Sequence, residues 1–278
     1  MTVLQFRSKV KTEQKATSGA EAQLITIWGP HGSTGKSTLA LNLAYEFAAL
    51  SQRVMLLDLD THAPALNQLL PLGDASAGLA GAARLIRQGR FNTEQLDRLS
   101  AKIKHGRTHF QLLPGLPISS RWPEVTSDTV RQLISICSQN FDVIIADVAS
   151  DLEDSLTRPD TPTSRNAATR AALEISTQVI VCMAGSHLSI SRYLNDFATL
   201  NELQKSRRLI INRSEPNQQL VAAIRALTKE RIDAVIPNDE PALELAESQK
   251  LPLALARRKS PARNAIAALA HKLLAWAP

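Results

Sequence analysis

The sequence is poor in cysteines and aromatic residues, and it contains no long apolar run. Its 278 residues include two cysteines, and aromatic residues make up 4% of the chain. Both thiols, Cys137 and Cys182, lie within short apolar segments, which argues against a disulfide framework or a cysteine-bound metal cluster. No segment approaches the ~18 consecutive apolar residues of a membrane span, and the N-terminus lacks a signal-peptide core of about 7–15 apolar residues. These absences predict a cytoplasmic protein.

Acidic residues are absent from the C-terminal segment, residues 248–278, although the segment holds six basic residues. Residues 1–247 carry 26 basic and 26 acidic residues, so this segment accounts for the whole net charge of +6. A basic end indicates an anionic partner such as DNA, lipid headgroups or an acidic protein, or else a solvated cationic flank. The six residues are Lys250, Arg257, Arg258, Lys259, Arg263 and Lys272.

Short apolar runs alternate with helical patterns along most of the chain. Residues 1–22 are polar and predict a flexible arm, and residues 23–278 predict one domain. Continuous runs of β-branched residues and leucine are typical of strands covered on both faces. The pattern therefore predicts a three-layer α/β/α fold with a mostly parallel sheet, with residues 70–107 as a helical excursion. Strands are expected at Leu24–Trp28, Arg53–Asp60, Phe110–Gly115, Asp142–Asp147, Gln178–Met183, Arg208–Arg213 and Ala234–Pro237.

A glycine-containing loop, GPHGSTGKST, connects the first predicted strand to a predicted helix. A loop of this kind with Gly-Lys-Ser at the helix start is a P-loop arrangement, in which backbone N–H groups point at phosphate oxygens. Lys36 would neutralise the β- and γ-phosphates, and the Ser37 hydroxyl is placed to ligate Mg²⁺. The usual pattern has glycine at the position of Pro30, but strand, loop and helix follow in the required order.

Three aspartates lie at the ends of predicted strands. Asp58 and Asp60 end the second strand, and Asp147 ends the fourth. Strand C-termini of such a sheet converge on the ligand crevice, so these carboxylates are expected near Mg²⁺ and the γ-phosphate. The alternative is that each one ends its strand as a turn or cap residue.

With these motifs the chain resembles the ParA/MinD family of deviant Walker A ATPases, which partition DNA or position cell-division, pilus and flagellar machinery. The resemblance covers about Leu24 to Leu274. It rests on GPHGSTGKSTLALNLA, LLDLDTHAPAL, FDVIIADVAS, LIINR and IPNDEPALELAESQKLPL, in this order and spacing. The WGP opening and PGLPISSRWPE look most like the CpaE/TadZ-like pilus-assembly branch as it occurs in actinobacteria.

The resemblance implies ATP and Mg²⁺ as ligands and assigns roles to individual residues. Lys36 would be the Walker A lysine, Asp60 would orient the attacking water, and Asp147 would contact Mg²⁺ through water as the Walker B carboxylate. Asp58 would support the water shell of the metal, and Asn212 would read the adenine edge. The implied nucleotide-binding set is Gly32, Ser33, Thr34, Gly35, Lys36, Ser37, Thr38, Asn212 and Pro237, and the implied metal set is Ser37, Asp58 and Asp147.

His31 departs from the family pattern, which has a second lysine at this position. That lysine reaches across an ATP-sandwiched dimer to the phosphates of the partner, and a cation there assists phosphoryl transfer. A histidine is shorter and mostly neutral at pH 7. Either His31 takes over part of this role as a catalytic residue, or the protein binds ATP and hydrolyses it slowly.

Three functions remain in view. The first is a positioning ATPase that dimerises with ATP and localises a partner such as a pilus or secretion apparatus. The second is a non-hydrolysing scaffold on the same fold, and the third is a DNA-partitioning ATPase that uses the basic C-terminal segment. The final helix, from Ala262 onward, has an apolar face that predicts docking on the sheet, with peripheral membrane contact as the alternative.

Overall fold

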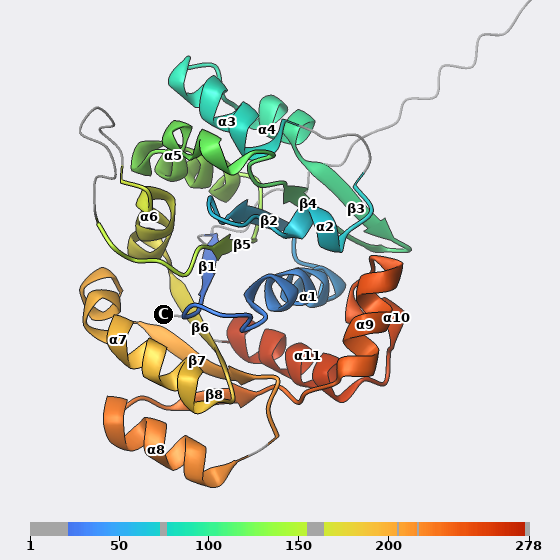
Figure 1. Cartoon of the computed structure of the whole chain (residues 1–278). Coiled ribbons are helices and arrows are strands. Elements are labelled where there is room, and N and C mark those ends of the chain that lie inside the picture. Colours follow the sequence, from blue (N-terminus) through green and yellow to red (C-terminus); the bar gives the residue numbers. More distant parts are fainter. Residues whose placement is uncertain (1–21, 73–76, 155–163, 205, 216, 276–278) are drawn as a thin grey trace, which may run out of the picture.

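A twisted eight-stranded sheet forms the centre of the molecule. The computed structural model describes residues 22–72, 77–154, 164–204, 206–215 and 217–275 (Figure 1). The strand order is β3-β4-β2-β5-β1-β6-β7-β8, with β3 antiparallel to β4 and all other neighbours parallel. The strands are β1 (Gln23–Trp28), β2 (Val54–Leu59), β3 (Ala101–His105), β4 (Thr108–Leu113), β5 (Val143–Val148), β6 (Gln178–Ala184), β7 (Arg207–Asn212) and β8 (Ile232–Val235).

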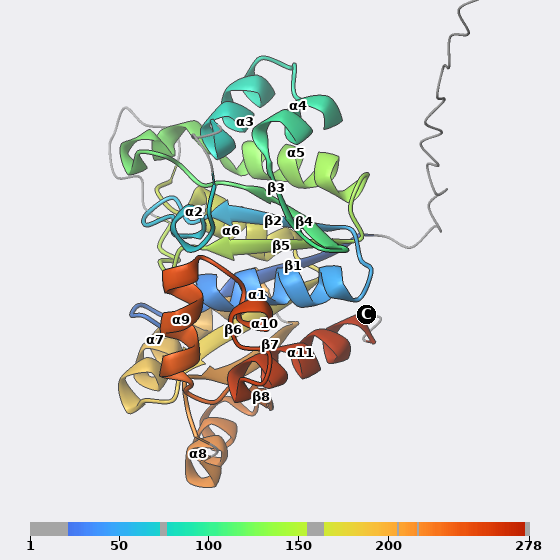
Figure 2. The same ribbon diagram turned by 90° about the vertical axis from the view of Figure 1, so that its right-hand side faces the viewer.

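Helices cover both faces of this sheet, which confirms the predicted three-layer α/β/α fold. Figures 1 and 2 show α1 beside α11 on one face, and α5, α6 and α7 lie on the other. The helices are α1 (Lys36–Ala49), α2 (Leu66–Leu69), α3 (Gly78–Arg87), α4 (Thr93–Leu99), η1 (Ser119–Glu124, a 3₁₀ helix), α5 (Ser127–Ser138), α6 (Ala167–Ile175), α7 (His187–Leu203), α8 (Gln218–Thr228), α9 (Glu240–Gln249), α10 (Leu253–Ala256) and α11 (Pro261–Leu274).

The central strand β1 explains why the apolar runs are continuous. Leu24 and Trp28 belong to the core on the α5–α7 side, whereas Ile25 and Ile27 belong to the core beneath α1. Successive side chains of a strand point to opposite faces, so a strand buried on both faces requires apolar residues at every position. The seven predicted strands are all present, each within two residues of its expected ends.

The prediction of a helical excursion over residues 70–107 was wrong at its C-terminal end. The described part of this segment does contain α3 and α4, but Ala101–His105 forms strand β3, paired antiparallel with β4. Of the five residues in β3 only Ile103 is buried, and two of its neighbours are lysines. A short edge strand of this composition has too little apolar alternation to be recognised, and its lysines are typical of an exposed sheet edge.

The C-terminal helix α11 is docked on the sheet, as predicted. Its buried residues include Ile266, Leu269 and Leu273, and it packs against α1. Arg263 of the basic segment is committed to this packing, because its Nε donates to Glu46 Oε1 of α1 at 2.8 Å. No described helix is long and apolar enough to cross a membrane.

Two predictions on the chain ends are not tested by the fold. The predicted arm, residues 1–22, lies outside the described residues except for its last position. In the basic segment, five of the six cations are exposed and form no ion pair with a described residue. These five are Lys250, Arg257, Arg258, Lys259 and Lys272.

Candidate functional site

The loop between β1 and α1 has the backbone geometry of an anion-binding loop. Gly35 precedes α1 in a left-handed conformation (φ 84°), and the helix start has no side-chain cap and no acidic residue in its first turn. A Cβ atom at Gly35 would lie 2.5 Å from Asn212 Nδ2, so only glycine fits here. The first N–H groups of α1 therefore have no capping side chain, and together with the helix dipole they favour a bound anion.

The carbonyl groups of the same loop are bound by side chains that come from distant strands and helices. Asn212 Nδ2 donates to the Thr34 carbonyl at 2.8 Å, and Arg192 Nη1 donates to the His31 carbonyl at 2.8 Å. Arg213 Nη1 lies 3.4 Å from the Ser33 carbonyl. These contacts hold three carbonyl groups of the loop in place from other parts of the fold.

Lys36, the predicted phosphate-binding lysine, is engaged by the loop that follows β5. Its Nζ donates to Ser150 Oγ at 2.7 Å. The Ser150 carbonyl in turn accepts a hydrogen bond from Trp28 Nε1 at 3.0 Å, which ties the end of β1 to the same loop. The lysine is thus held at the mouth of the site by a neutral hydroxyl, a partner that an anionic phosphate can replace.

Asp147 and Asp58 lie side by side at the C-terminal ends of β5 and β2. The two residues are paired in the parallel register, and both side chains are buried. Burial raises the pKa of Asp147 to about 7, against the lowering effects of the Ser37 hydroxyl and the Lys36 ammonium group. Burial and then the neighbouring Asp147 raise the pKa of Asp58 well above its ordinary value. The structure therefore brings these two predicted carboxylates together with Lys36 and Ser37.

The two carboxylates differ in how their oxygens are used. Asp58 Oδ1 accepts from the Asp60 N–H at 3.3 Å, and its Oδ2 accepts from the Leu66 N–H at 3.1 Å. Asp58 thus uses both oxygens to hold the backbone of the loop after β2. Both Asp147 oxygens are fully buried and lack a hydrogen bond of normal geometry within the described part of the chain.

Asp60, the predicted water-orienting residue, is partly exposed and caps a tight turn. Its Oδ1 accepts from the N–H groups of His62 and Ala63, both at 2.8 Å. No described residue donates to its Oδ2. One oxygen of this carboxylate therefore fixes the side chain, and the other is available to a water molecule.

The start of α6 connects the loop after β2 with the loop after β5. Arg165 Nη2 donates to the Thr61 carbonyl at 3.0 Å, and the guanidinium stacks 5.0 Å above the ring of Trp122. Asn166 Oδ1 lies 2.7 Å from His62 Nε2, while its Nδ2 donates to the Glu153 carbonyl at 2.9 Å. The two loops that flank the phosphate position are thereby joined through one helix terminus.

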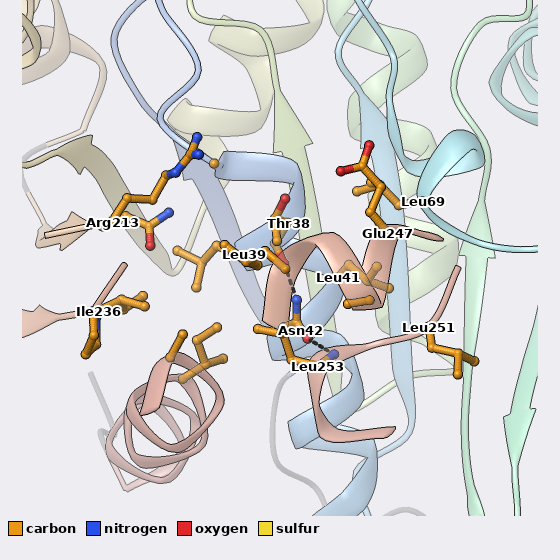
Figure 3. A pocket seen from close by; sticks show the side chains of 17 residues that line it. Thr38, Leu39, Leu41, Asn42, Leu69, Arg213, Ile236, Glu247, Leu251 and Leu253 are labelled. Carbon is orange, nitrogen blue, oxygen red and sulfur yellow. Dashed lines mark hydrogen bonds between the residues drawn. The ribbon is translucent and has the colours of Figure 1, made fainter. Parts of the chain in front are cut away.

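A largely apolar cavity of about 150 Å³ opens beside the loop and α1 (Figure 3). Asn212, Arg213 and Pro237 line it near Gly35, and α9 closes the opposite wall with Glu247. In Figure 3, Arg213 and Ile236 face Leu69 and Glu247 across this space. The cavity adjoins the phosphate-binding loop, and its largely apolar lining with a few polar groups is typical of a small-molecule site.

The comparison with protein-family models decides the family. The model described as the CobQ/CobB/MinD/ParA nucleotide binding domain matches residues 25–253. The chain belongs to this family. The matched region spans β1 to the start of α10 and so contains every predicted site residue.

Individual members and fold neighbours agree with this placement in the CobQ/CobB/MinD/ParA family. The chain is 27% identical over 271 residues to the chromosome-partitioning ATPase Soj of Thermus thermophilus, covering 92% of this chain and 97% of that protein. A ParA family ATPase from Chlorobium tepidum has the same fold, with a TM-score of 0.78, 19% identity and coverage of 91% and 98% of the two chains. The MinD structure from Pyrococcus horikoshii, a complex with Mg-ADP, gives a TM-score of 0.71 at 18% identity, covering 91% and 96%.

The family site residues present here fit a magnesium ion that is carried in with a nucleotide. Among the described residues there is no group of three or more His, Cys, Asp or Glu that could hold a metal alone. Magnesium normally uses one or two protein ligands together with waters and substrate phosphates. Asp147, with two buried oxygens lacking normal hydrogen bonds, and the neighbouring Ser37 hydroxyl provide such a partial ligand set.

Four residues of the site were not among the predicted ones. Ser150 ends the motif FDVIIADVAS and could have been proposed from its position after a strand end. Arg165, Asn166 and Arg192 carry no local signal, because each acts on a loop more than a hundred positions earlier in the chain. Their roles depend on which helix termini the fold places over the loops.

The buried carboxylates predict a pH-dependent stability of the nucleotide-free, metal-free protein. A carboxyl with a raised pKa in the folded state binds protons more tightly there than in the unfolded state. Its contribution to the free energy of unfolding is thus complete below pH ~4 and is lost as the pH rises through about 7. Asp147→Asn removes the titrating group, so in EDTA the variant should melt several degrees above the parent at pH 7.5.

The same two proteins should melt at similar temperatures at pH 5, where the carboxyl of the parent is protonated. Melting temperatures from circular dichroism in EDTA at the two pH values give the comparison. A variant that is destabilised equally at pH 5 and pH 7.5 would show that Asp147 is held in its charged form by the fold.

Proposed function

We propose that this protein is an ATP-binding positioning ATPase of the MinD/ParA type, which dimerises with ATP and hydrolyses it slowly. The observation that carries the proposal is the loop Gly29–Thr38, whose carbonyls are bound by Asn212, Arg213 and Arg192 while Lys36 and the Ser37 hydroxyl lie beside the buried Asp147. Bound Mg²⁺ would neutralise charge on the β- and γ-phosphates. The chain itself supplies phosphate donors, a cation and a carboxylate that can orient water.

Asn212 supports adenine as the base. Its Nδ2 is used by the Thr34 carbonyl, so its Oδ1 is left as an acceptor at the wall of the cavity. An acceptor at this position can receive a hydrogen bond from the amino group of adenine, whereas it repels the carbonyl oxygen of guanine, which is also an acceptor. Since a mismatched buried polar group costs about 1–3 kcal/mol, ATP should bind at least about tenfold more tightly than GTP.

Asn212→Ala is expected to bring the affinities for ATP and GTP within about threefold of each other, because the acceptor is lost. Competition with a fluorescent ATP analogue measures both affinities. Asn238→Ala, at an exposed neighbour of Pro237, is the control and should keep the preference of the parent. A parent protein that binds both nucleotides equally would contradict the assignment of Asn212.

ATP-dependent dimerisation follows from the exposed edge of the loop. His31 is exposed at the mouth of the site, where a second copy of the chain could approach the nucleotide. We expect a weak dimer with ATP, a monomer with ADP or without nucleotide, and stronger dimerisation in His31→Lys. Light scattering in the three states tests this, and a constant monomer in all of them would favour a scaffold that binds ATP without switching.

The partner of the switch is proposed from the sequence resemblance to the CpaE/TadZ-like branch. A pilus or secretion apparatus in the cytoplasm-facing envelope would be localised by the ATP-bound dimer and released after hydrolysis. The motif PGLPISSRWPE forms η1 and the residues before it, and Trp122 of this segment contacts Arg165, which binds the loop after β2. Contact between this segment and the site gives a partner bound here a route to sense the nucleotide.

DNA is the second candidate partner, favoured by the five exposed cations of residues 248–278. Electrostatic binding to DNA should weaken steeply with salt, with one released counterion for about each phosphate contact. Gel shifts at low and moderate salt, with the parent and with Arg257→Ala/Arg258→Ala/Lys259→Ala, test this. Retention of DNA by the triple variant at the same salt would exclude the C-terminal segment as the binding surface.

A further inference from the structure

Arg192 of α7 places a guanidinium on the outer edge of the phosphate-binding loop. Its Nη1 donates to the His31 carbonyl at 2.8 Å. A Cβ atom at Gly32 would lie 2.9 Å from the same nitrogen, so the guanidinium is in direct contact with the loop backbone. Among described residues no acceptor is seen for Nε or Nη2, and these two donors remain for a ligand.

The edge of the loop is otherwise short of positive charge. His31 occupies it with an exposed imidazole, and Lys36 is turned inward to Ser150. Arg213 also reaches the loop, but it lines the base cavity. Two carboxylates, Asp196 and Asp151, lie near His31. Burial raises the pKa of Asp196, His31 lowers this pKa, and Asp151 raises it. Of the two arginines that contact the loop, Arg213 lines the cavity beside α1 and Arg192 does not.

The backbone that carries Arg192 is rigidly attached to the loop. The neighbouring Tyr193 is fully buried, its ring lies 6.5 Å from that of Trp28 at the end of β1, and its hydroxyl donates to Glu230. Trp28 leads directly into the loop through Gly29. The guanidinium is therefore held in register with the loop by packed side chains, which is the arrangement that a preorganised charge requires.

The exposure of the loop edge indicates which nucleotide Arg192 can reach. His31, Gly32 and Ser33 are exposed, and the partly exposed Arg192 contacts this edge at the His31 carbonyl. A second copy of the chain that approaches this edge would meet the guanidinium. A guanidinium presents several donors in one plane and suits phosphate oxygens well.

We infer that Arg192 supplies positive charge at this edge of the loop by contacting the phosphates of ATP held by a second copy of this chain. The inference rests on the proposed ATP-dependent dimer. In it α7, rather than the loop itself, carries the cation that stabilises the negative charge developing during phosphoryl transfer. Arg192 and His31 then act as one unit, in which the histidine carbonyl positions the arginine.

The decisive variant is Arg192→Gln, which keeps a donor for the His31 carbonyl and removes the charge. We expect its turnover to fall at least about tenfold and its ATP-dependent dimer to weaken, with the Mg·ATP affinity of the monomer unchanged within about threefold. Arg192→Lys should retain part of the turnover. Arg225→Ala, at an exposed arginine of α8, is the control and should behave as the parent.

A second substitution tests the shared role with His31. Adding His31→Lys to Arg192→Gln should restore turnover and dimerisation, because the loop then carries its own cation. For the parent, turnover per protomer should rise with protein concentration, and Arg192→Gln should lose this rise. Phosphate release and light scattering across a concentration series provide both readouts.

Each result bears on one claim. If Arg192→Gln equals the parent in turnover and dimerisation, or loses turnover equally at all concentrations, the inference is wrong. Absence of rescue by His31→Lys would also count against it. Calorimetry on the parent is a separate test, since a parent that does not bind Mg·ATP would refute the proposed function without any variant of Arg192.

Discussion

Replacement of Lys36 by alanine is expected to reduce Mg·ATP binding by about a hundredfold or more, the largest loss predicted for any single residue here. Lys36 lies at the start of α1 among the free N–H groups, and it supplies a full charge where the phosphates would lie. Charge-assisted hydrogen bonds to a phosphate are worth about 1.5–3 kcal/mol each in a desolvated site. Isothermal titration calorimetry of the parent and of Lys36→Ala measures the loss.

Two controls separate lost binding from lost structure. Lys104→Ala removes an exposed lysine of the edge strand β3 and should leave ATP binding unchanged. Ser150→Ala removes the partner of Lys36 in the free protein and should keep or improve ATP affinity, because no hydrogen bond has to be exchanged on binding. Equal affinity in Lys36→Ala and the parent would refute the phosphate-binding assignment of the loop.

Asp60→Asn is expected to lower ATP turnover by about a hundredfold while ATP affinity stays within about threefold, the range reported by positioned acid–base groups. The amide keeps an oxygen that can accept from His62 and Ala63, so the turn is preserved. It loses the charged Oδ2 that would orient and polarise the attacking water. Phosphate release and nucleotide titration, measured on the same preparations, separate the two effects.

Asp147→Asn should act differently, by raising the concentration of Mg²⁺ needed for tight ATP binding. Asp147 has two buried oxygens without normal hydrogen bonds, whereas Asp60 already uses one oxygen for its turn. Asp128→Asn, at an exposed acid of α5, is the control for both variants. If both site variants lost ATP affinity to the same degree, the division between metal support and water orientation would be wrong.

Most of the fold could be predicted from the sequence because its central strands are buried on both faces. Such strands need mostly apolar residues on both faces, and β1, β5 and β6 therefore are rich in Ile and Val with few polar positions. The edge strand β3 was not predicted, because it is mostly exposed and its Lys102 and Lys104 interrupt the apolar pattern. Helix α6, whose buried face is formed largely by alanines such as Ala168 and Ala171, was also missed.

Some residues of the candidate site could be predicted from their local sequence, and others are placed there only by distant parts of the fold. Lys36, Ser37 and Asp147 were predicted because each lies at a strand end or helix start, where sequence position fixes spatial position. Arg192 and Arg165 reach the site through long side chains from helices whose placement depends on the whole sheet. Only the fold shows that their guanidinium groups end on carbonyls of the two loops.

The position of β1 in the sheet has a consequence for the order in which the protein folds. β1 is the first strand to be synthesised, yet its two neighbours are β5, paired from Gln23 with Val143, and β6, paired from Ile25 with Gln178. Contacts between segments so distant in sequence form slowly, because closing the long loop between them costs conformational entropy before the strand pairing can stabilise the chain. The loop that begins at Gly29 therefore gains its support only after most of the chain has left the ribosome. The nucleotide site is a late product of folding, and ATP can stabilise the finished domain without guiding its first steps.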